Sequence, residues 1–245
     1  MMHAKAFDGS RIEPSPGARA ACPSCGSPVR AKCGTVNVWH WAHESADCDP
    51  WAEPETGWHA WWKSAFDPGC QEVVRGCHRA DIVTPSGIVL EVQHSTISAE
   101  DIQERERYYG RRMMWILDMR EQRDNFDVRT RDGFSTFRWK HPRRSFWASD
   151  RMIVLDLGGR IFVVKKLHTD TPCGGWGKSM TLEAFLVALG GYGCNAWDVQ
   201  MAWSRLDALE SKRFYAVRVD ERRRLDTEAQ QARASALATQ DGGCC

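Results

Sequence analysis

The chain has 245 residues, of which 42% are hydrophobic and 27% charged, and its formal net charge is +1. This length and composition fit a globular protein of one or two domains and exclude a largely disordered chain. The balanced charge excludes a uniformly polycationic protein, but it is compatible with local basic patches.

Neither a membrane span nor a secretory leader is predicted. No apolar run approaches the ~20 residues that a membrane-spanning helix needs. The first 20 residues contain no apolar segment of the kind found in signal peptides. We therefore expect a cytoplasmic protein with no membrane partner, a compartment in which disulfides are rare. The ten cysteines of the chain then need another explanation.

Residues 1–20 are predicted to be a short arm, and residues 21–50 a small metal-stapled module. Two cysteines in the turn Cys-Pro-Ser-Cys-Gly are spaced to bind one ion, and Cys/His partners follow within ~25 residues. A site with four protein ligands leaves no open position, so its expected role is structural. Reduced thiols with core histidines are the alternative. The favoured zinc ligands are Cys22, Cys25, His43 and Cys48, with His40 as the alternative ligand, whereas Cys33 fits a hairpin turn better.

A helix is predicted over residues 54–66, because Pro54 suits a first helical position and Asp67-Pro68-Gly69 ends it. Its Trp58, Trp61 and Trp62 form an apolar stripe that would pack on a sheet. A neighbouring stripe, spaced i, i+4, i+8, lies at the border between core and solvent. That stripe is either functional or a solvated face with local ion pairs, and it consists of Glu55, His59 and Lys63.

Three strands are predicted next, at 71–74, 80–83 and 88–92. If Pro85-Ser86-Gly87 is a three-residue hairpin loop, Asp81 lies opposite Glu91, and Gln93 shares their face. Two adjacent carboxylates repel each other unless they are neutralised, and Mg²⁺ or Mn²⁺ prefers such oxygen ligands. A half-buried charged pair without a metal is the alternative interpretation.

The chain then continues with a helix from Ser98 to about Tyr109 and a strand over 113–117, which complete an α/β core. Residues 129–151 are basic, and the interleaved Phe137, Trp139, Phe146 and Trp147 could stack on nucleic-acid bases. Ordinary strands with solvated Arg side chains are the alternative interpretation of this stretch. A hairpin around Gly158-Gly159 and helices over 181–189 and 197–215 follow. We expect a zinc module (1–52), an α/β core (53–125) and a C-terminal α+β extension (126–245) with a basic stretch and a helical tail.

Several motifs occur in the order of a known family: CPSCG, HWAH, CDPW, ETGWHAWWK, RADI, LEVQHSTIS, ERERYYG and MMWILD. This order resembles the competence protein CoiA-like family over roughly residues 20–120. The resemblance implies a restriction-endonuclease-like core of the PD-(D/E)XK nuclease superfamily. Asp81 and Glu91 match its metal-binding acids, and Gln93 replaces its usual Lys. The other matching residues are Glu55, His59 and Lys63 of the helical motif, and His94, Ser95, Arg105 and Tyr109 around it.

The resemblance implies a metal-dependent nuclease or nuclease-like protein that acts on single- or double-stranded DNA. Gln can orient a water molecule but cannot deprotonate it. Lys63 or His59 could compensate, and slow or conditional cleavage is the alternative. One alternative is a DNA-binding or recombination-assisting protein without catalysis, in which the zinc module and the basic stretch bind DNA. Another is a protein–protein adaptor that uses the Trp-rich helix.

Overall fold

The computed structural model describes residues 1–35, 37–45, 48–51, 55–169 and 173–191. All of these described residues belong to one compact unit. The helix predicted over 197–215 and the helical tail lie outside the described residues. No described helix is long and apolar enough to cross a membrane.

The N-terminal sheet has the strand order β2-β1-β3-β4-β5, and all of its pairings are antiparallel. Three of its strands lie before residue 22, so the prediction of a simple arm over residues 1–20 is wrong. A small core under the sheet, built from Ala4, Ala20, Val29 and Trp41, explains why this segment folds. The strands are β1 (Ala4–Lys5), β2 (Arg11–Ile12), β3 (Arg19–Ala21), β4 (Pro28–Lys32) and β5 (His40–His43).

A second sheet has nine strands in the order β10-β11-β14-β13-β12-β9-β8-β7-β6. β9 pairs in parallel with both β8 and β12, and the other neighbours are antiparallel. The predicted boundary at 125/126 falls inside this sheet, so the later strands extend the core sheet instead of forming their own. The strands are β6 (Gln71–Arg75), β7 (His78–Val83), β8 (Val89–Gln93), β9 (Met113–Asp118), β10 (Phe126–Arg131), β11 (Phe134–Trp139), β12 (Met152–Asp156), β13 (Arg160–Leu167) and β14 (Gly174–Thr181).

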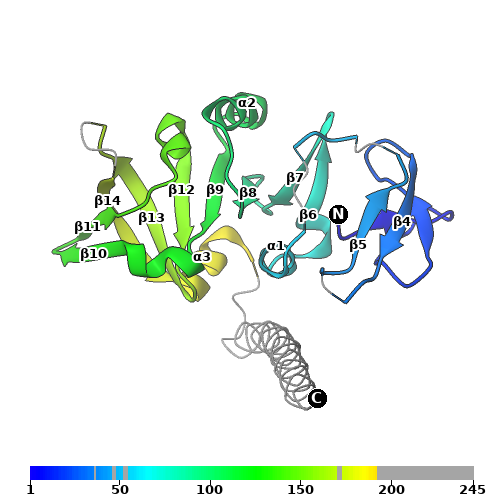
Figure 1. Ribbon diagram of the computed structural model, residues 1–245, viewed down its shortest axis with the longest axis horizontal. Helices are drawn as coiled ribbons and strands as arrows, with labels where there is room; N and C mark the ends of the chain where they lie inside the picture. Colours follow the sequence, from blue (N-terminus) through cyan, green and yellow to red (C-terminus); the bar gives the residue numbers. More distant parts are fainter. Residues whose placement is uncertain (36, 46–47, 52–54, 170–172, 192–245) are drawn as a thin grey trace, which may run out of the picture. The chain divides into compact units, whose positions relative to one another are not determined.

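Helices cover both faces of the nine-stranded sheet, with α2 (Ala99–Tyr109) on one side and α1 (Gly57–Ser64) and α3 (Leu182–Leu189) on the other (Figure 1). Successive side chains of β12 point alternately to the α2 side and to the α1 side of the sheet. Ile153 and Leu155 join the core cluster that contains Ile102 of α2, whereas Asp156 bonds to α1. The short helices are η1 (Pro68–Cys70), η2 (Arg120–Asn125) and η3 (Arg144–Ala148).

The Trp-rich helix α1 is seated on the sheet by a buried carboxylate. Asp156 is completely buried, and its Oδ2 accepts hydrogen bonds from Trp58 Nε1 (2.8 Å) and Trp62 Nε1 (3.0 Å). Trp61 is 4% exposed. The predicted packing stripe is therefore confirmed. An adaptor role for this Trp stripe is wrong, because its side chains are already used in the core.

Replacing Asp156 with alanine should destabilise the fold by about 2–5 kcal/mol, because two buried indole N–H groups lose their acceptor. Urea unfolding followed by circular dichroism measures this loss. The matched control is Asp124→Ala, which removes a carboxylate that is 95% exposed and should change stability by less than about 0.5 kcal/mol. Equal stability of the two variants would contradict the role assigned to Asp156.

Candidate metal centre and acidic cavity

Three cysteines and one histidine gather at the end of the N-terminal sheet. The ligand atoms of Cys22, Cys25, His43 and Cys48 all lie within 4.8 Å of one another. The Sγ atoms of Cys22 and Cys48 are 3.7 Å apart, and Cys25 Sγ is 3.5 Å from His43 Nε2. Tetrahedral zinc with ordinary bond lengths needs sulfur–sulfur separations of about 3.8 Å and sulfur–nitrogen separations of about 3.5 Å. The Cys22–Cys48 and Cys25–His43 separations match these values, so the cluster could bind zinc.

The turn between β3 and β4 prepares the first two ligands. Gly26 has a φ of +74°, and its N–H bonds to Cys22 O at 2.9 Å, which closes the turn. The backbone N–H groups of Ser24 and Ser27 then point at the sulfurs of Cys22 and Cys25, each at 3.4 Å. These bonds stabilise thiolates, which are the form that binds metal.

The thiols of the cluster influence one another. Hydrogen bonds from Ser27 lower the pKa of Cys25 to about 6. Burial, reinforced by the neighbouring Cys25 and Cys22, raises the pKa of Cys48 to about 12. Several thiolates at this distance repel each other, and a divalent cation would relieve that repulsion.

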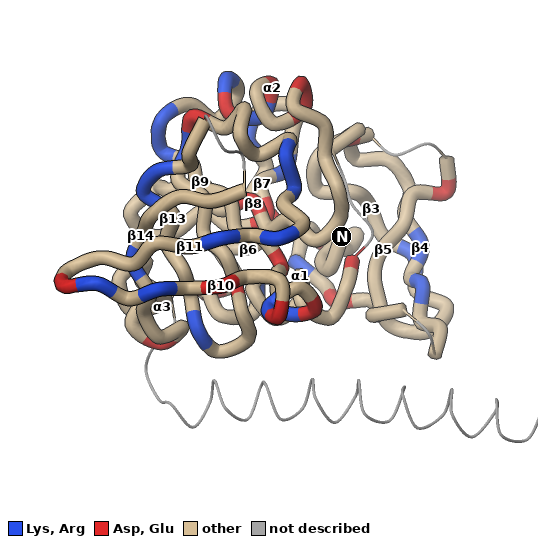
Figure 2. Tube along the Cα trace, turned by 60° about the vertical axis from the view of Figure 1, so that its left-hand side comes forward, with Lys and Arg blue, Asp and Glu red and all other residues tan. Residues whose placement is uncertain are grey.

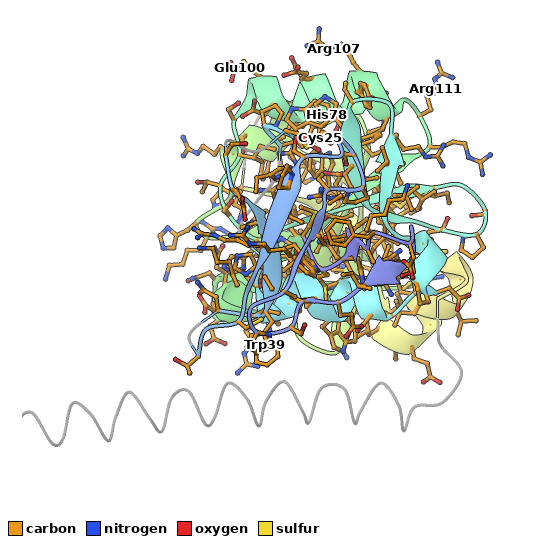
Figure 3. All side chains as sticks on the ribbon, turned by 90° about the vertical axis from the view of Figure 1, so that its right-hand side faces the viewer. Cys25, Trp39, His78, Glu100, Arg107 and Arg111 are labelled. Carbon is orange, nitrogen blue, oxygen red and sulfur yellow. The ribbon has the colours of Figure 1, made fainter. Side chains whose placement is uncertain are left out.

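The alternative ligand His40 does not join the cluster. Its Nδ1 lies 2.8 Å from Val38 O, at the start of β5, whereas His43 ends the strand opposite Val29. Cys33 follows β4, outside the described ligand cluster. Figure 3 shows Cys25 and Trp39, which lies in the β4–β5 loop, at opposite ends of this sheet. Among the described residues, the geometry therefore favours His43.

A second site is a cavity of about 30 Å³ on the nine-stranded sheet, which is room for one or two water-sized groups. Several predicted catalytic residues line it together, although they come from three different segments. The lining residues are Met1, Asp49, Trp51, Glu55, His59, Lys63, Arg79, Asp81, Glu91, Val92 and Arg105.

The hairpin register that was predicted for this site is confirmed. Thr84 N bonds to Ile88 O at 2.9 Å, and the ladder continues with Val83 opposite Val89 and Ile82 opposite Leu90. The next residues in this register are Asp81 and Glu91. There the ladder gives way to a side-chain bond, because Asp81 Oδ2 accepts the Val92 N–H at 3.0 Å.

The ammonium group of Lys63 forms ion pairs with three acidic side chains. Its Nζ lies 2.9 Å from Glu55 Oε2, 3.2 Å from Asp81 Oδ1 and 3.3 Å from Glu72 Oε1. Burial by itself would lower the pKa of Lys63, but these carboxylates outweigh it and raise the pKa above its usual value. A charged lysine therefore neutralises these acids, as the alternative interpretation without a metal allowed.

Glu55 reaches this cluster without being part of the helix. Thr56 caps α1 by accepting a hydrogen bond from His59 N, and the helix begins at Gly57. The predicted stripe of Glu55, His59 and Lys63 is thus helical only from His59 onward. The carboxylate nevertheless accepts a hydrogen bond from Lys63 Nζ at 2.9 Å.

Glu72 is a site residue that the sequence does not predict, because residues 71–74 indicate only an apolar strand. Its side chain is buried, and it accepts backbone N–H bonds from Met2 at 2.8 Å and His3 at 3.0 Å. Lys63 and Arg79 outweigh the effect of burial and lower the pKa of Glu72. The only available signal was an acidic residue inside an apolar run, at a position whose φ of +49° no sequence pattern indicates.

Glu91 belongs to a second group of interacting charges at the cavity. Arg105 Nη1 bonds to its Oε2 at 3.2 Å, yet burial and the nearby Asp81 raise the pKa of Glu91 to about 8. In the described part of the chain, neither Glu91 Oε1 nor the buried Glu55 Oε1 has a hydrogen-bond partner. Unpartnered carboxylate oxygens beside a small cavity are suitable ligands for Mg²⁺ or Mn²⁺.

The other predicted site residues surround the cavity instead of lining it. Gln93 is buried and donates to Ser95 O at 3.3 Å. His94 Nδ1 lies 2.9 Å from Asp118 Oδ2, so this ring has a carboxylate partner of its own. Tyr109 contacts Trp51 edge-on, and burial raises the pKa of its phenol.

A short segment joins the Cys/His cluster to the acidic cavity. Asp49, directly after Cys48, accepts hydrogen bonds from Arg79 N and from His78 Nδ1, both at 2.9 Å, on the strand that carries Asp81. Trp51 stacks on His78 at 3.3 Å, and its carbonyl accepts Arg105 Nη2 at 3.1 Å. The arginine that holds Glu91 is thus anchored by residues next to a candidate zinc ligand.

The aromatic residues predicted to stack on nucleic-acid bases are largely unavailable. Phe137, Trp139 and Phe146 are at most 6% exposed and belong to the core. Trp147 packs against that core, and its Nε1 donates to His168 O at 2.7 Å. The stacking role assigned to these four residues is wrong.

The fold and these two sites define an α+β domain with an acidic cavity, preceded by a small Cys/His module. Comparison with family models gives the same division. Residues 19–50 match the N-terminal domain of competence protein CoiA, and residues 73–150 match the nuclease-like domain of competence protein CoiA. These matches confirm the resemblance and support a CoiA-like competence protein family for this chain. No curated protein and no solved structure matches the chain.

Proposed function

We propose that the protein is a divalent-metal-dependent DNA nuclease with a PD-(D/E)XK-type core. The observation that carries this proposal is the convergence of Glu55, Asp81 and Glu91 on one cavity, and two of these acids, Asp81 and Glu91, lie in the segment that matches a nuclease-like domain. Zinc at the Cys/His cluster would be structural, because four protein ligands would complete its coordination.

The residues of the cavity have different proposed roles. Asp81, Glu91 and Glu55 would hold Mg²⁺ or Mn²⁺, which when bound would polarise the scissile phosphate and lower the pKa of a water molecule. Lys63 forms ion pairs with Glu55 and Asp81, and its positive charge would counter the charge that develops on the phosphate. His59 lines the cavity and can exchange protons, a capacity that Gln93 lacks.

Glu91→Gln and Asp81→Asn should each lower cleavage of linear DNA at least about 100-fold, since losing a metal ligand removes several kcal/mol of transition-state stabilisation. The assay uses the full chain with double- and single-stranded DNA, with and without added Mg²⁺ or Mn²⁺. Glu100→Gln is the matched control, because it makes the same chemical change on the exposed side of α2. Melting temperatures show whether each variant folds.

Cleavage that persists in both cavity variants, or that needs no divalent cation, would contradict the proposal. DNA binding without any cleavage under these conditions would instead favour the second candidate, a non-catalytic DNA-binding protein. The observation that favours this candidate is that Lys63 and Arg105 already neutralise the cavity acids.

A further inference from the structure

One exposed face of the nine-stranded sheet is built differently from the rest. A continuous row of paired residues crosses four strands: Arg129 on β10 pairs with Thr136 on β11, Thr136 pairs with Trp176 on β14, and Trp176 pairs with Lys166 on β13. Directly paired residues point to the same face of a sheet. The row therefore places a tryptophan between two cations on one surface.

Residues two positions away along each strand share this face. On β10 and β11 they add Arg131, which pairs with Phe134, and Arg138. On β14 they add Lys178, and each of these side chains is exposed. We call this surface the β11–β14 face, defined by Arg129, Arg131, Phe134, Thr136, Arg138, Lys166, Trp176 and Lys178.

The two aromatic rings of the β11–β14 face are accessible to solvent. Phe134 is 43% exposed and Trp176 is 39% exposed, and their ring centroids lie 6.2 Å apart in an edge-on arrangement. Their strand neighbour Phe137 is buried because it points to the opposite face. Two large rings left in water on adjacent strands provide apolar surface that a flat ligand could cover.

Cations surround these rings. The β11–β14 face carries Arg129, Arg131, Arg138, Lys166 and Lys178. One acidic residue of β10, Asp127, also lies on this face, because it pairs with Arg138. Figure 2 shows the basic residues as successive blue segments along β10 and β11. The near-neutral charge of the whole chain therefore conceals a strongly positive local surface.

We propose that the β11–β14 face binds a single strand of DNA, with unpaired bases stacked on Trp176 and Phe134 and phosphates held by the surrounding Arg and Lys side chains. Stacking needs bases that are not already paired, which favours a single strand over a duplex. This inference deepens the proposed function and rests on it for the choice of DNA. β14 and β8 are separated by four strand spacings, roughly 19 Å, so the face is separate from the acidic cavity.

The test measures binding of a fluorescent 12-nucleotide oligothymidylate by anisotropy, without added divalent cations so that the strand stays intact. Trp176→Ala should weaken binding about 5- to 150-fold, the range expected for losing one base stack. Trp176→Phe should retain most of the affinity. Val187→Ala, which removes an exposed apolar side chain on α3, is the matched control and should leave binding unchanged.

A second variant tests the charges. Arg129→Gln combined with Lys178→Gln should weaken binding and reduce the dependence of affinity on salt concentration, since fewer counterions are released. Wild-type affinity in Trp176→Ala would overturn the proposal, as would binding of a 12-base-pair duplex as tight as that of the single strand. So would a dimer that dissociates in Trp176→Ala, because the face would then bind a second copy of the chain.

Failure of this proposal is distinguishable from failure of the nuclease proposal. Loss of binding in Trp176→Ala supports the β11–β14 face even if no variant cleaves DNA. Metal-dependent cleavage that is abolished by Glu91→Gln, together with unchanged binding in Trp176→Ala, supports the nuclease and rejects the face.

Discussion

Lys63→Met should lower the free energy of unfolding by about 3–5 kcal/mol, the cost of removing one partner from a buried ion pair. The methionine preserves most of the side-chain volume, so the loss is mainly one of charge. Glu55, Asp81 and Glu72 would then face one another without the ammonium that now lies within 3.3 Å of each. Urea unfolding in metal-free buffer measures the difference.

Lys165→Met, which changes an exposed lysine of β13, is the matched control and should alter stability by less than about 0.5 kcal/mol. Glu72→Gln gives a second check. Because Lys63 and Glu72 interact directly, the glutamine should cost less in the Lys63→Met background than in the wild type. Strictly additive losses would show that the ion cluster does not couple these residues as the distances indicate.

The sequence predicted the local parts of the cavity because they depend on short spacings. The loop Pro85-Ser86-Gly87 determines which residues of β7 and β8 pair, so a count from the turn correctly aligned Ile82 with Leu90. The same count placed Asp81 near Glu91, and both line the cavity. The Cys-x-x-Cys turn and the cap Ser98 are local in the same sense, whereas the Thr56 cap of α1 differs from the predicted helix start at Pro54.

Contacts between distant segments were not accessible in this way. Asp156 supports Trp58 and Trp62 across more than 90 positions of sequence, and no spacing rule relates them. Glu72 likewise joins the first residues of the chain to Lys63 through an unusual backbone conformation. Such contacts follow from the packing of α1 and the N-terminal sheet, which a pattern of residue types does not determine.

The error over base stacking has a different cause. Strand β11 carries aromatic residues at positions of both parities, so alternation alone does not say which face is buried. The neighbouring rings determine which face is buried. Phe137 packs on Phe126 and Phe162, whereas the described ring contact of Phe134 is an edge-on contact with the exposed Trp176. The order of strands, with β14 beside β11, supplied information that the local sequence lacked.

Zinc binding at the Cys/His cluster is expected to be necessary for the N-terminal sheet to fold. We expect one zinc ion per chain in the purified protein, and His43→Ala or Cys25→Ser should abolish it and unfold the N-terminal sheet. Structural zinc sites contribute roughly 10–16 kcal/mol in small zinc-binding peptides, because metal binding and folding are coupled. The measurements are zinc content by elemental analysis and unfolding by circular dichroism, with His40→Ala as the matched control that keeps its zinc.

Loss of zinc should also weaken the contacts that hold residues around the acidic cavity. Once Cys48 is released, Asp49 would no longer hold His78 and Arg79, and Trp51 would no longer anchor Arg105. Hydrogen exchange should therefore accelerate in β7 of His43→Ala, while β12 and β13, whose pairing does not involve this segment, keep their protection. Unchanged exchange in β7 would show that the cavity does not depend on the module. Zinc-free protein with an intact N-terminal sheet would remove the structural role of the Cys/His cluster itself.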